Sequence, residues 1–141
     1  MPILYYTTTI SPHKTLSEVQ EHLARVGAKR VGVDYDNDRK PDALLFMLDV
    51  GGTTLNYRMP CNWHGMLKAM LHDESVPNRY CNEEQAMRTG WRIIKVWVEA
   101  QTAMIQAGLA RTPEVFLPYL VGNDGRTLYE HFADEPKNLL R

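Results

Sequence analysis

The feature that most constrains the fold of this 141-residue chain is residues 83–108, a long segment without proline and with many strong helix formers. At 1.5 Å per residue, a helix of this length spans about 39 Å. A compact domain of this size has a radius of gyration of only about 14 Å. The helix must therefore cross the whole molecule or protrude from it.

Apolar side chains occupy most of the circumference of this predicted helix. A rotation of 100° per residue places the polar side chains in one arc of about 80°, made of Arg88, Arg92, Lys95, Glu99 and Gln106. The apolar side chains cover about 200°, twice the stripe of an ordinary surface helix; they are Met87, Trp91, Ile93, Ile94, Val96, Trp97, Val98 and Ile105. We therefore predict that the helix is buried on two sides.

The chain's own sheet is expected to cover one side, and two alternatives remain for the other. The first is the C-terminal region, where Thr112-Pro113 is a typical helix start and residues 128–132 predict a short helix after the turn at 122–125. The second is another copy of the chain. The interface predicted for such a homodimer comprises Trp91, Ile94, Trp97, Val98, Phe116 and Tyr119.

Four segments in the first half of the chain have the composition of strands. Residues 3–10 are rich in β-branched and aromatic residues, which suit a pleated surface. Residues 30–36 and 54–59 alternate between apolar and polar, whereas residues 43–50 are apolar on both faces and are predicted to lie centrally. The short connections between the last three favour hairpins. We predict a four-stranded, mostly antiparallel sheet.

Capping signals place the other helices. Thr15 and Glu18 have capping-box spacing ahead of an apolar helical repeat that ends at Gly27. Asn62 is expected to cap a helix over residues 63–71, and Asn82 with Gln85 forms a second capping box at the start of the long helix. The predicted architecture is a single α+β domain over residues 1–141, in the order β-α-β-β-β followed by helices, with one long central helix at about 83–108.

Composition excludes several classes of protein. Sixteen basic and seventeen acidic residues leave a net charge of −1, which argues against a strongly cationic polymer binder. No apolar run reaches the roughly 18–20 residues that cross a bilayer, and the first ten residues lack the pattern of a signal peptide. Two cysteines are too few for a disulfide scaffold. We expect a soluble, cytoplasmic protein.

Metal sites are not favoured by the spacing of the candidate ligands. Cys61, His64, His72 and Cys81 are all potential zinc ligands. The two histidines, however, would lie about 12 Å apart along one helix, and the alternative is a buried Cys61 with solvent-facing histidines. Asp34, Asp36 and Asp38 begin like a calcium loop, but Arg39 and Leu45 stand where glycine and glutamate are needed. A polar hairpin tip explains these aspartates better.

Catalytic motifs are equally sparse. The sequence contains no G-x-S-x-G nucleophile motif, and Gly51-Gly52 lacks the lysine and the helix of a phosphate-binding loop. Residues 122–127 fit an anion site with Arg126, but a plain turn capped by Thr127 explains them better. We predict no metal, no cofactor and no catalytic residue. If the protein is nevertheless an enzyme, Cys61, His64 and His72 are the first residues to test.

The sheet offers a candidate binding surface. If Tyr57 and the valines face the helices, then Arg30, Asn56 and Arg58 share the opposite face with residues of the apolar central strand. Basic, polar and apolar side chains on an open sheet are typical of single-stranded nucleic-acid binding. Arg88, Arg92 and Lys95 form a second candidate phosphate track. The alternatives are solvated surfaces, or a sheet face covered by a protein.

Three segments resemble a family of small proteins carried by bacteriophages and integrated mobile elements: MPCNW, GWRIIKVWVEAQTAMIQAG and VFLPYLVGNDGRTLYEHF. The resemblance extends over about residues 15–132. That family has no established activity, cofactor or catalytic residue, so it implies no role for any single position. It implies a setting in which small accessory proteins assist DNA replication or recombination, or inhibit host defence.

These observations together predict a non-enzymatic phage or mobile-element accessory protein. The leading hypothesis is association with nucleic acid, single-stranded in particular, through the open sheet face. The alternative is a protein-binding inhibitor or scaffold directed at a host defence factor. A homodimer is expected in either case, because the long helix carries more apolar surface than one sheet can cover.

Overall fold

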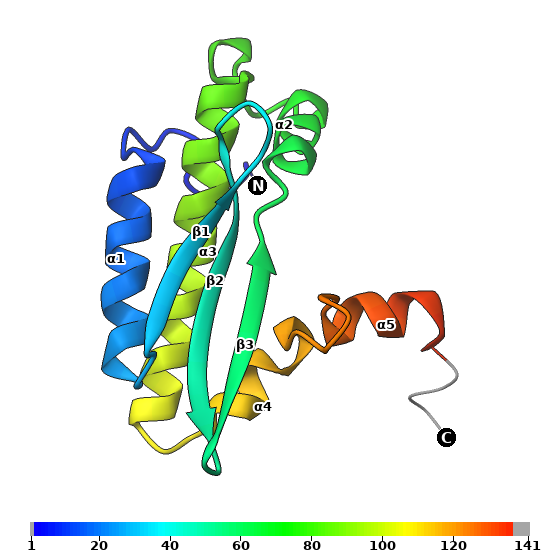
Figure 1. The fold of residues 1–141 in the computed structure, drawn as a ribbon. Coiled ribbons are helices and arrows are strands. Elements are labelled where there is room, and N and C mark those ends of the chain that lie inside the picture. The colour runs from blue at the N-terminus through cyan, green and yellow to red at the C-terminus, as the bar shows by residue number, and fades with distance from the viewer. Residues whose placement is uncertain (1, 137–141) are drawn as a thin grey trace.

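The computed structural model describes residues 2–136, so both ends of the predicted 1–141 domain lie outside the described residues. It shows an α+β fold in which helices pack on one face of a three-stranded antiparallel sheet (Figure 1). In chain order the elements are α1 (Pro12–Arg25), β1 (Arg30–Tyr35), β2 (Pro41–Val50), β3 (Thr53–Pro60), α2 (Trp63–His72), η1 (Asn78–Tyr80), α3 (Glu83–Gln106), α4 (Thr112–Phe116), η2 (Leu117–Tyr119) and α5 (Leu128–Asp134). The α+β class is therefore confirmed.

The fourth strand, predicted over residues 3–10, was wrong. This segment forms turns: Tyr6 N donates to Ile3 O and Thr8 N donates to Tyr5 O, and Tyr5 has a φ of 61°. Side chains of α3 bind the backbone of the segment, because Gln85 Nε2 donates to Tyr6 O at 2.7 Å and to Thr8 O at 2.9 Å. The β-propensity of the segment is thus overridden by partners that lie more than seventy residues away.

The start of α1 also differs from the prediction. Ser11 caps the helix through a hydrogen bond from Lys14 N, and Pro12 stands in the first turn, where its missing N–H costs nothing. Thr15, the predicted cap, lies inside the helix and is fully buried. Glu18, its predicted partner, instead pairs with Arg92 of α3.

The three strands pair in the order β1-β2-β3, as the hairpin signals predicted. The register aligns Gly32 with Leu45 and Leu45 with Arg58, so these three residues share one face of the sheet. Their neighbours along each strand project from the opposite face. The inner face carries the core side chains Val31, Val33, Leu44, Phe46, Leu48, Tyr57 and Met59, against which α1 and α3 pack. Within residues 2–136, no helix lies over the outer face (Figure 1).

The long helix α3 is unbroken and ends two residues earlier than predicted, where Ala107 caps it and Gly108 adopts a φ of 75°. At its other end Asn82 caps Gln85 N at 2.9 Å, as predicted. The helix runs behind the sheet between α1 and α2 (Figure 1), and Trp91 and Val98 are fully buried. Its own chain therefore covers it on more than one side.

The C-terminal region returns to the free side of β3. Val121 N donates to Asn56 O at 2.8 Å, and Leu120 forms a bridge with Tyr57. Beyond this contact α5 projects away from the body of the protein (Figure 1). Across residues 2–136, no helix combines the length and the apolar character that crossing a membrane requires.

Candidate functional site

Arg30, Asn56 and Arg58 lie together on the outer face of the sheet, as the alternation of β1 and β3 predicted. The register aligns Arg30 with Met47 and Met47 with Asn56, and Arg58 stands one pair further along. These residues line a shallow concavity of about 470 Å³, together with Gly32, Leu45, Val121 and atoms of Val31, Phe46 and Tyr57, whose side chains belong to the core.

A missing side chain makes this surface concave. Gly32 lies in β1 opposite Leu45, and a Cβ built on it meets no atom within 4 Å. The floor beside it is formed by Leu45 and Met47, both half-buried. The C-terminal return adds Val121 at the β3 side. The concavity therefore has an apolar floor with cationic and amide groups around it, a combination that the sequence pattern of the strands alone does not reveal.

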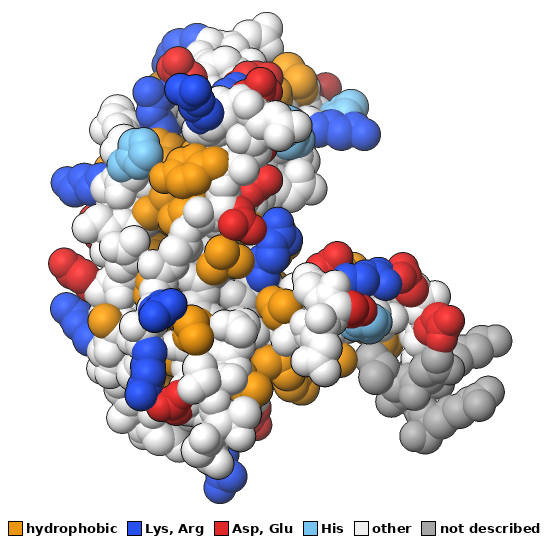
Figure 2. Space-filling view, in the orientation of Figure 1, with side chains coloured by type: hydrophobic (Ala, Val, Ile, Leu, Met, Phe, Trp, Pro, Cys, Tyr) orange, Lys and Arg blue, Asp and Glu red, His pale blue; other side chains and the backbone are white. Residues whose placement is uncertain are grey.

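Basic and acidic side chains alternate across this face. Arg58 Nε lies 3.4 Å from Asp34 Oδ2, and Lys29 Nζ lies 2.9 Å from Asp49 Oδ2. A hydrogen bond from Thr54 and the pairing with Lys29 lower the pKa of Asp49 below its usual range. Figure 2 shows the resulting mixture of blue, red and orange side chains in front of the strands.

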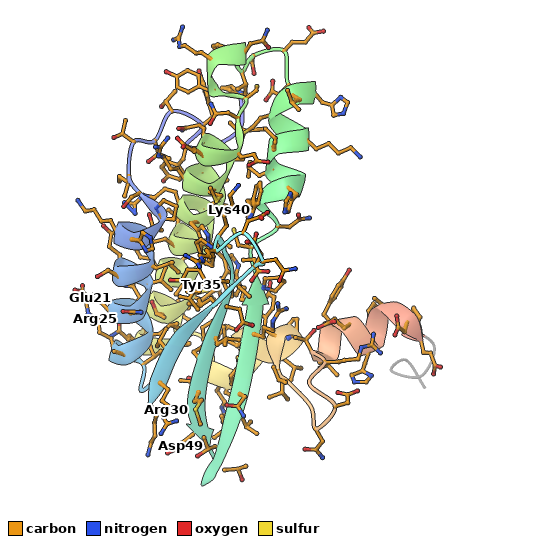
Figure 3. The ribbon with its side chains drawn as sticks, turned by 45° about the horizontal axis from the view of Figure 1, so that its top comes forward. Glu21, Arg25, Arg30, Tyr35, Lys40 and Asp49 are labelled. Carbon is orange, nitrogen blue, oxygen red and sulfur yellow. The ribbon has the colours of Figure 1, made fainter. Side chains whose placement is uncertain are left out.

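Arg30 is the exception in this pattern of paired charges. Its side chain extends from the lower end of β1 near Asp49 (Figure 3). Among residues 2–136 it has no ion-pair partner. It is therefore the cation on this face that is most readily available to an external anion.

The polar arc of α3 lies in the other layer of the molecule, against α1. Arg92 Nη1 lies 2.5 Å from Glu18 Oε2, and Lys95 Nζ lies 4.0 Å from the same oxygen and also pairs with Glu99. Arg92 is only 9% exposed. The second candidate phosphate track, Arg88, Arg92 and Lys95, is therefore separated from the sheet face, and two of its three cations hold α1 to α3.

The structure divides the six predicted interface residues into two groups. Trp91, Val98 and Phe116 belong to the buried core. The other three, Ile94, Trp97 and Tyr119, are half-exposed and line a hollow of about 210 Å³. A second hollow of about 400 Å³ between α2 and α3 shares Pro60, Ile93 and Ile94 with the first. The two hollows together form an apolar groove along α3.

The predicted zinc candidates do not converge. Cys61 is buried, and burial is the main cause that raises the pKa of its thiol to about 12. His64 stacks on Trp63 with ring centroids 3.6 Å apart, and Cys81 Sγ–H donates to Met70 O. In the part of the chain that the structure describes, no group of three or more His, Cys, Asp or Glu residues is placed to hold a metal ion.

In two further loops, the candidate ligand side chains bind neighbouring groups of the same segment. Asp36 Oδ1 accepts hydrogen bonds from Asp38 N and Lys40 N, which makes the aspartate-rich segment a hairpin tip. In the turn at 122–127, Thr127 caps α5 and Arg126 pairs with Asp134 at 2.5 Å. Both loops match the structural alternatives that the sequence favoured.

Among residues 2–136, the outer face of the sheet and the apolar groove along α3 are thus two surfaces on which a ligand or a partner can bind. No protein-family model, curated protein or solved structure matches this chain.

Proposed function

We propose that this chain is a non-enzymatic accessory protein that binds single-stranded nucleic acid on the outer face of its sheet. The observation that supports this proposal is the concavity in which Arg30, Asn56 and Arg58 surround the apolar floor of Leu45 and Met47. A nucleotide has the complementary parts, since its base is flat and partly apolar and its phosphate is anionic. The phage or mobile-element setting implied by the resemblance fits such a role.

Each part of the surface has a distinct task in this proposal. The Arg30 guanidinium, exposed and unpaired in the described chain, contacts a phosphate, and Arg58 contacts a second one while it keeps Asp34 in place. A base lies on the floor, where Gly32 leaves room for it. The Asn56 amide can both donate to and accept from a base edge.

The charges of the face set the expected strength of binding. Two arginines neutralise at most about two phosphates, and single strands give a slope of about −0.7 per neutralised phosphate in a plot of log K against log salt. We therefore expect a slope of about −1.4. The carboxylates of Asp34 and Asp49 on the same face keep the affinity modest.

Replacement of Met47 by glutamate tests the proposal. A carboxylate on the apolar floor repels phosphate and removes the surface on which a base lies, so affinity for a fluorescent oligothymidylate should fall by about tenfold or more. Fluorescence anisotropy at 50 mM salt, a condition chosen to favour ionic contacts, measures the affinity. Gln20→Glu on the exposed side of α1 adds the same charge elsewhere and should change little.

Either of two results would contradict nucleic-acid binding at this face. One is the absence of measurable binding of any single-stranded or double-stranded oligonucleotide at low salt. The other is equal binding by the wild type and by Met47→Glu, with circular dichroism showing that the variant is folded. Equal binding would place the nucleic acid elsewhere on the molecule.

The apolar groove along α3 supports a second candidate function, capture of a host protein by an inhibitor or scaffold. Its lining of Ile94, Trp97 and Tyr119 suits the apolar face of a partner helix. A protein that co-purifies with the wild type should be lost with Ile94→Glu and retained with Met104→Glu, an exposed position on the same helix. Loss with both variants, or with neither, contradicts capture by this groove.

A further inference from the structure

The strand β1 has a free edge. It pairs with β2 on one side, and on its other side no strand pairs with it within the described residues. The opposite edge of the sheet is different, because Leu120 and Val121 contact β3 there. An edge strand leaves the N–H and C=O groups of every second residue unpaired, and proteins usually protect such an edge with lysine, proline or a covering element. The segment Arg30–Tyr35 contains no lysine and no proline, and its irregular pairing with β2 is confined to its end, between Asp34 and Tyr35.

The sequence of β1 is self-complementary about its glycine. The five residues Arg30-Val31-Gly32-Val33-Asp34 have opposite charges at their ends, valines inside them and Gly32 at the centre. An antiparallel pairing of two β1 strands around a two-fold axis at Gly32 places Arg30 of each copy opposite Asp34 of the other. It also places Val31 of each copy opposite Val33 of the other. Residues directly opposite in an antiparallel pair project from the same face.

We propose that a second copy of this chain pairs with the first through β1, in the register centred on Gly32, to form a six-stranded sheet. This interface differs from the one predicted on α3. The proposal does not rest on nucleic-acid binding, because it is argued from the free edge of β1, although Arg30 belongs to both the edge strand and the outer face.

The charges at this edge are suited to such a partner. Among residues 2–136, Arg30 is exposed and has no ion-pair partner, and the one ion pair of Asp34 is the 3.4 Å contact with Arg58. A carboxylate accepts several hydrogen bonds, so Asp34 can take Arg30 of a second copy in addition. Each Arg30 has five N–H donors and keeps some of them for another ligand.

The surroundings of the edge are compatible with a neighbouring copy. Tyr35, at the end of β1, is 52% exposed, and Figure 2 shows hydrophobic side chains between the upper part of α1 and β1. Glu21 and Arg25 point outward from α1, the helix next to β1 (Figure 3). They are one helical turn apart and of opposite charge, so two α1 helices that approach antiparallel bring unlike charges together.

Charge exchange tests the register directly. The wild type should show the mass of two chains by sedimentation equilibrium as its concentration is raised. Arg30→Asp places two carboxylates opposite each other, and Asp34→Arg places two guanidinium groups opposite each other, so each single variant should weaken the dimer by tenfold or more. The double variant Arg30→Asp/Asp34→Arg restores unlike pairs and should recover association. Arg39→Asp, at the exposed hairpin tip, is the matched control and should stay dimeric.

Hydrogen exchange provides a second readout that needs no substitution. Alternate N–H groups of β1 should exchange more slowly at high than at low protein concentration, whereas those of the β2 centre should not change. A single-chain mass of the wild type at every concentration overturns the proposal. So does a dimer that persists in both single variants, which would point to the groove along α3 instead.

The nucleic-acid and dimer proposals fail in different experiments. Met47→Glu lies on β2, one strand in from the edge and opposite Arg30. It should lower oligonucleotide affinity, whereas the backbone pairing of two β1 strands should still give the mass of two chains. The double variant Arg30→Asp/Asp34→Arg should recover the mass of two chains, whatever its effect on oligonucleotide affinity.

Discussion

Replacement of Trp91 by alanine is expected to lower the free energy of unfolding by about 3–5 kcal/mol, the cost typical of removing a buried tryptophan. The Trp91 side chain is fully buried in the core between α3 and the sheet. Its Nε1–H donates to Pro41 O at 3.2 Å, which joins α3 to the first residue of β2. Truncation leaves both a cavity and a carbonyl oxygen without that donor.

Trp97 provides the matched comparison, because it is on the same helix and was predicted to serve the same interface. Its ring is half-exposed and makes edge contacts with Phe116 and Tyr119. Trp97→Ala should cost about 1–2 kcal/mol, since part of the ring is already in water and the aromatic pairs contribute modestly. Urea denaturation followed by circular dichroism measures both variants. Equal costs would contradict the division of these residues between core and groove.

The parts of the fold that the sequence predicted well are those determined by local periodicity. The long helix α3 has a cap at Asn82 and an uninterrupted helical pattern, and the structure shows it as one helix. The strands β1 and β3 follow from the two-residue alternation, which also places Arg30, Asn56 and Arg58 on a common face, and β2 follows from its apolar run. Such features depend on neighbours within a few residues, so a sequence alone contains them.

The errors came from contacts between distant residues. The β-rich segment at 3–10 forms turns because Gln85 binds its carbonyl oxygens, and a glutamine in a helix gives no sign of that partner. The hollow at Gly32 needs the register of β1 on β2 and the return of Val121, both of which are tertiary. The sequence predicted four strands, whereas the sheet has three in the order β1-β2-β3, which leaves β1 as an edge strand.

The polar arc of α3 has the sequence pattern of a solvated helix face. Arg92 lies on this arc and is nevertheless 9% exposed, since Glu18 of α1 lies against it. The three-residue spacing of Glu18 from Thr15 predicted that Glu18 caps α1, whereas Glu18 pairs with Arg92 of α3. A polar stripe on a helix therefore indicates solvent only when no opposite charge on a neighbouring helix can reach it.

Replacement of Glu18 by leucine should destabilise the protein by about 2–3 kcal/mol. Removal of one partner from a fully buried ion pair costs about 3–5 kcal/mol. The lower figure applies here because the Glu18 side chain is still 31% exposed, whereas that of Arg92 is 11% exposed. Without Glu18, Arg92 and Lys95 lie near each other against α1, and only Lys95 keeps a carboxylate, that of Glu99.

The double variant Glu18→Leu/Arg92→Leu should recover part of this loss, because it removes the unpaired charge and leaves apolar side chains where α1 meets α3. Glu21→Leu, on the exposed side of α1, should change stability by less than about 0.5 kcal/mol. Urea denaturation of the wild type, Glu18→Leu, the second single variant Arg92→Leu and the double variant gives the coupling energy between positions 18 and 92. If Glu18→Leu cost no more than Glu21→Leu, the ion pair would not hold α1 to α3, and the arc of Arg88, Arg92 and Lys95 would again be a candidate for phosphate.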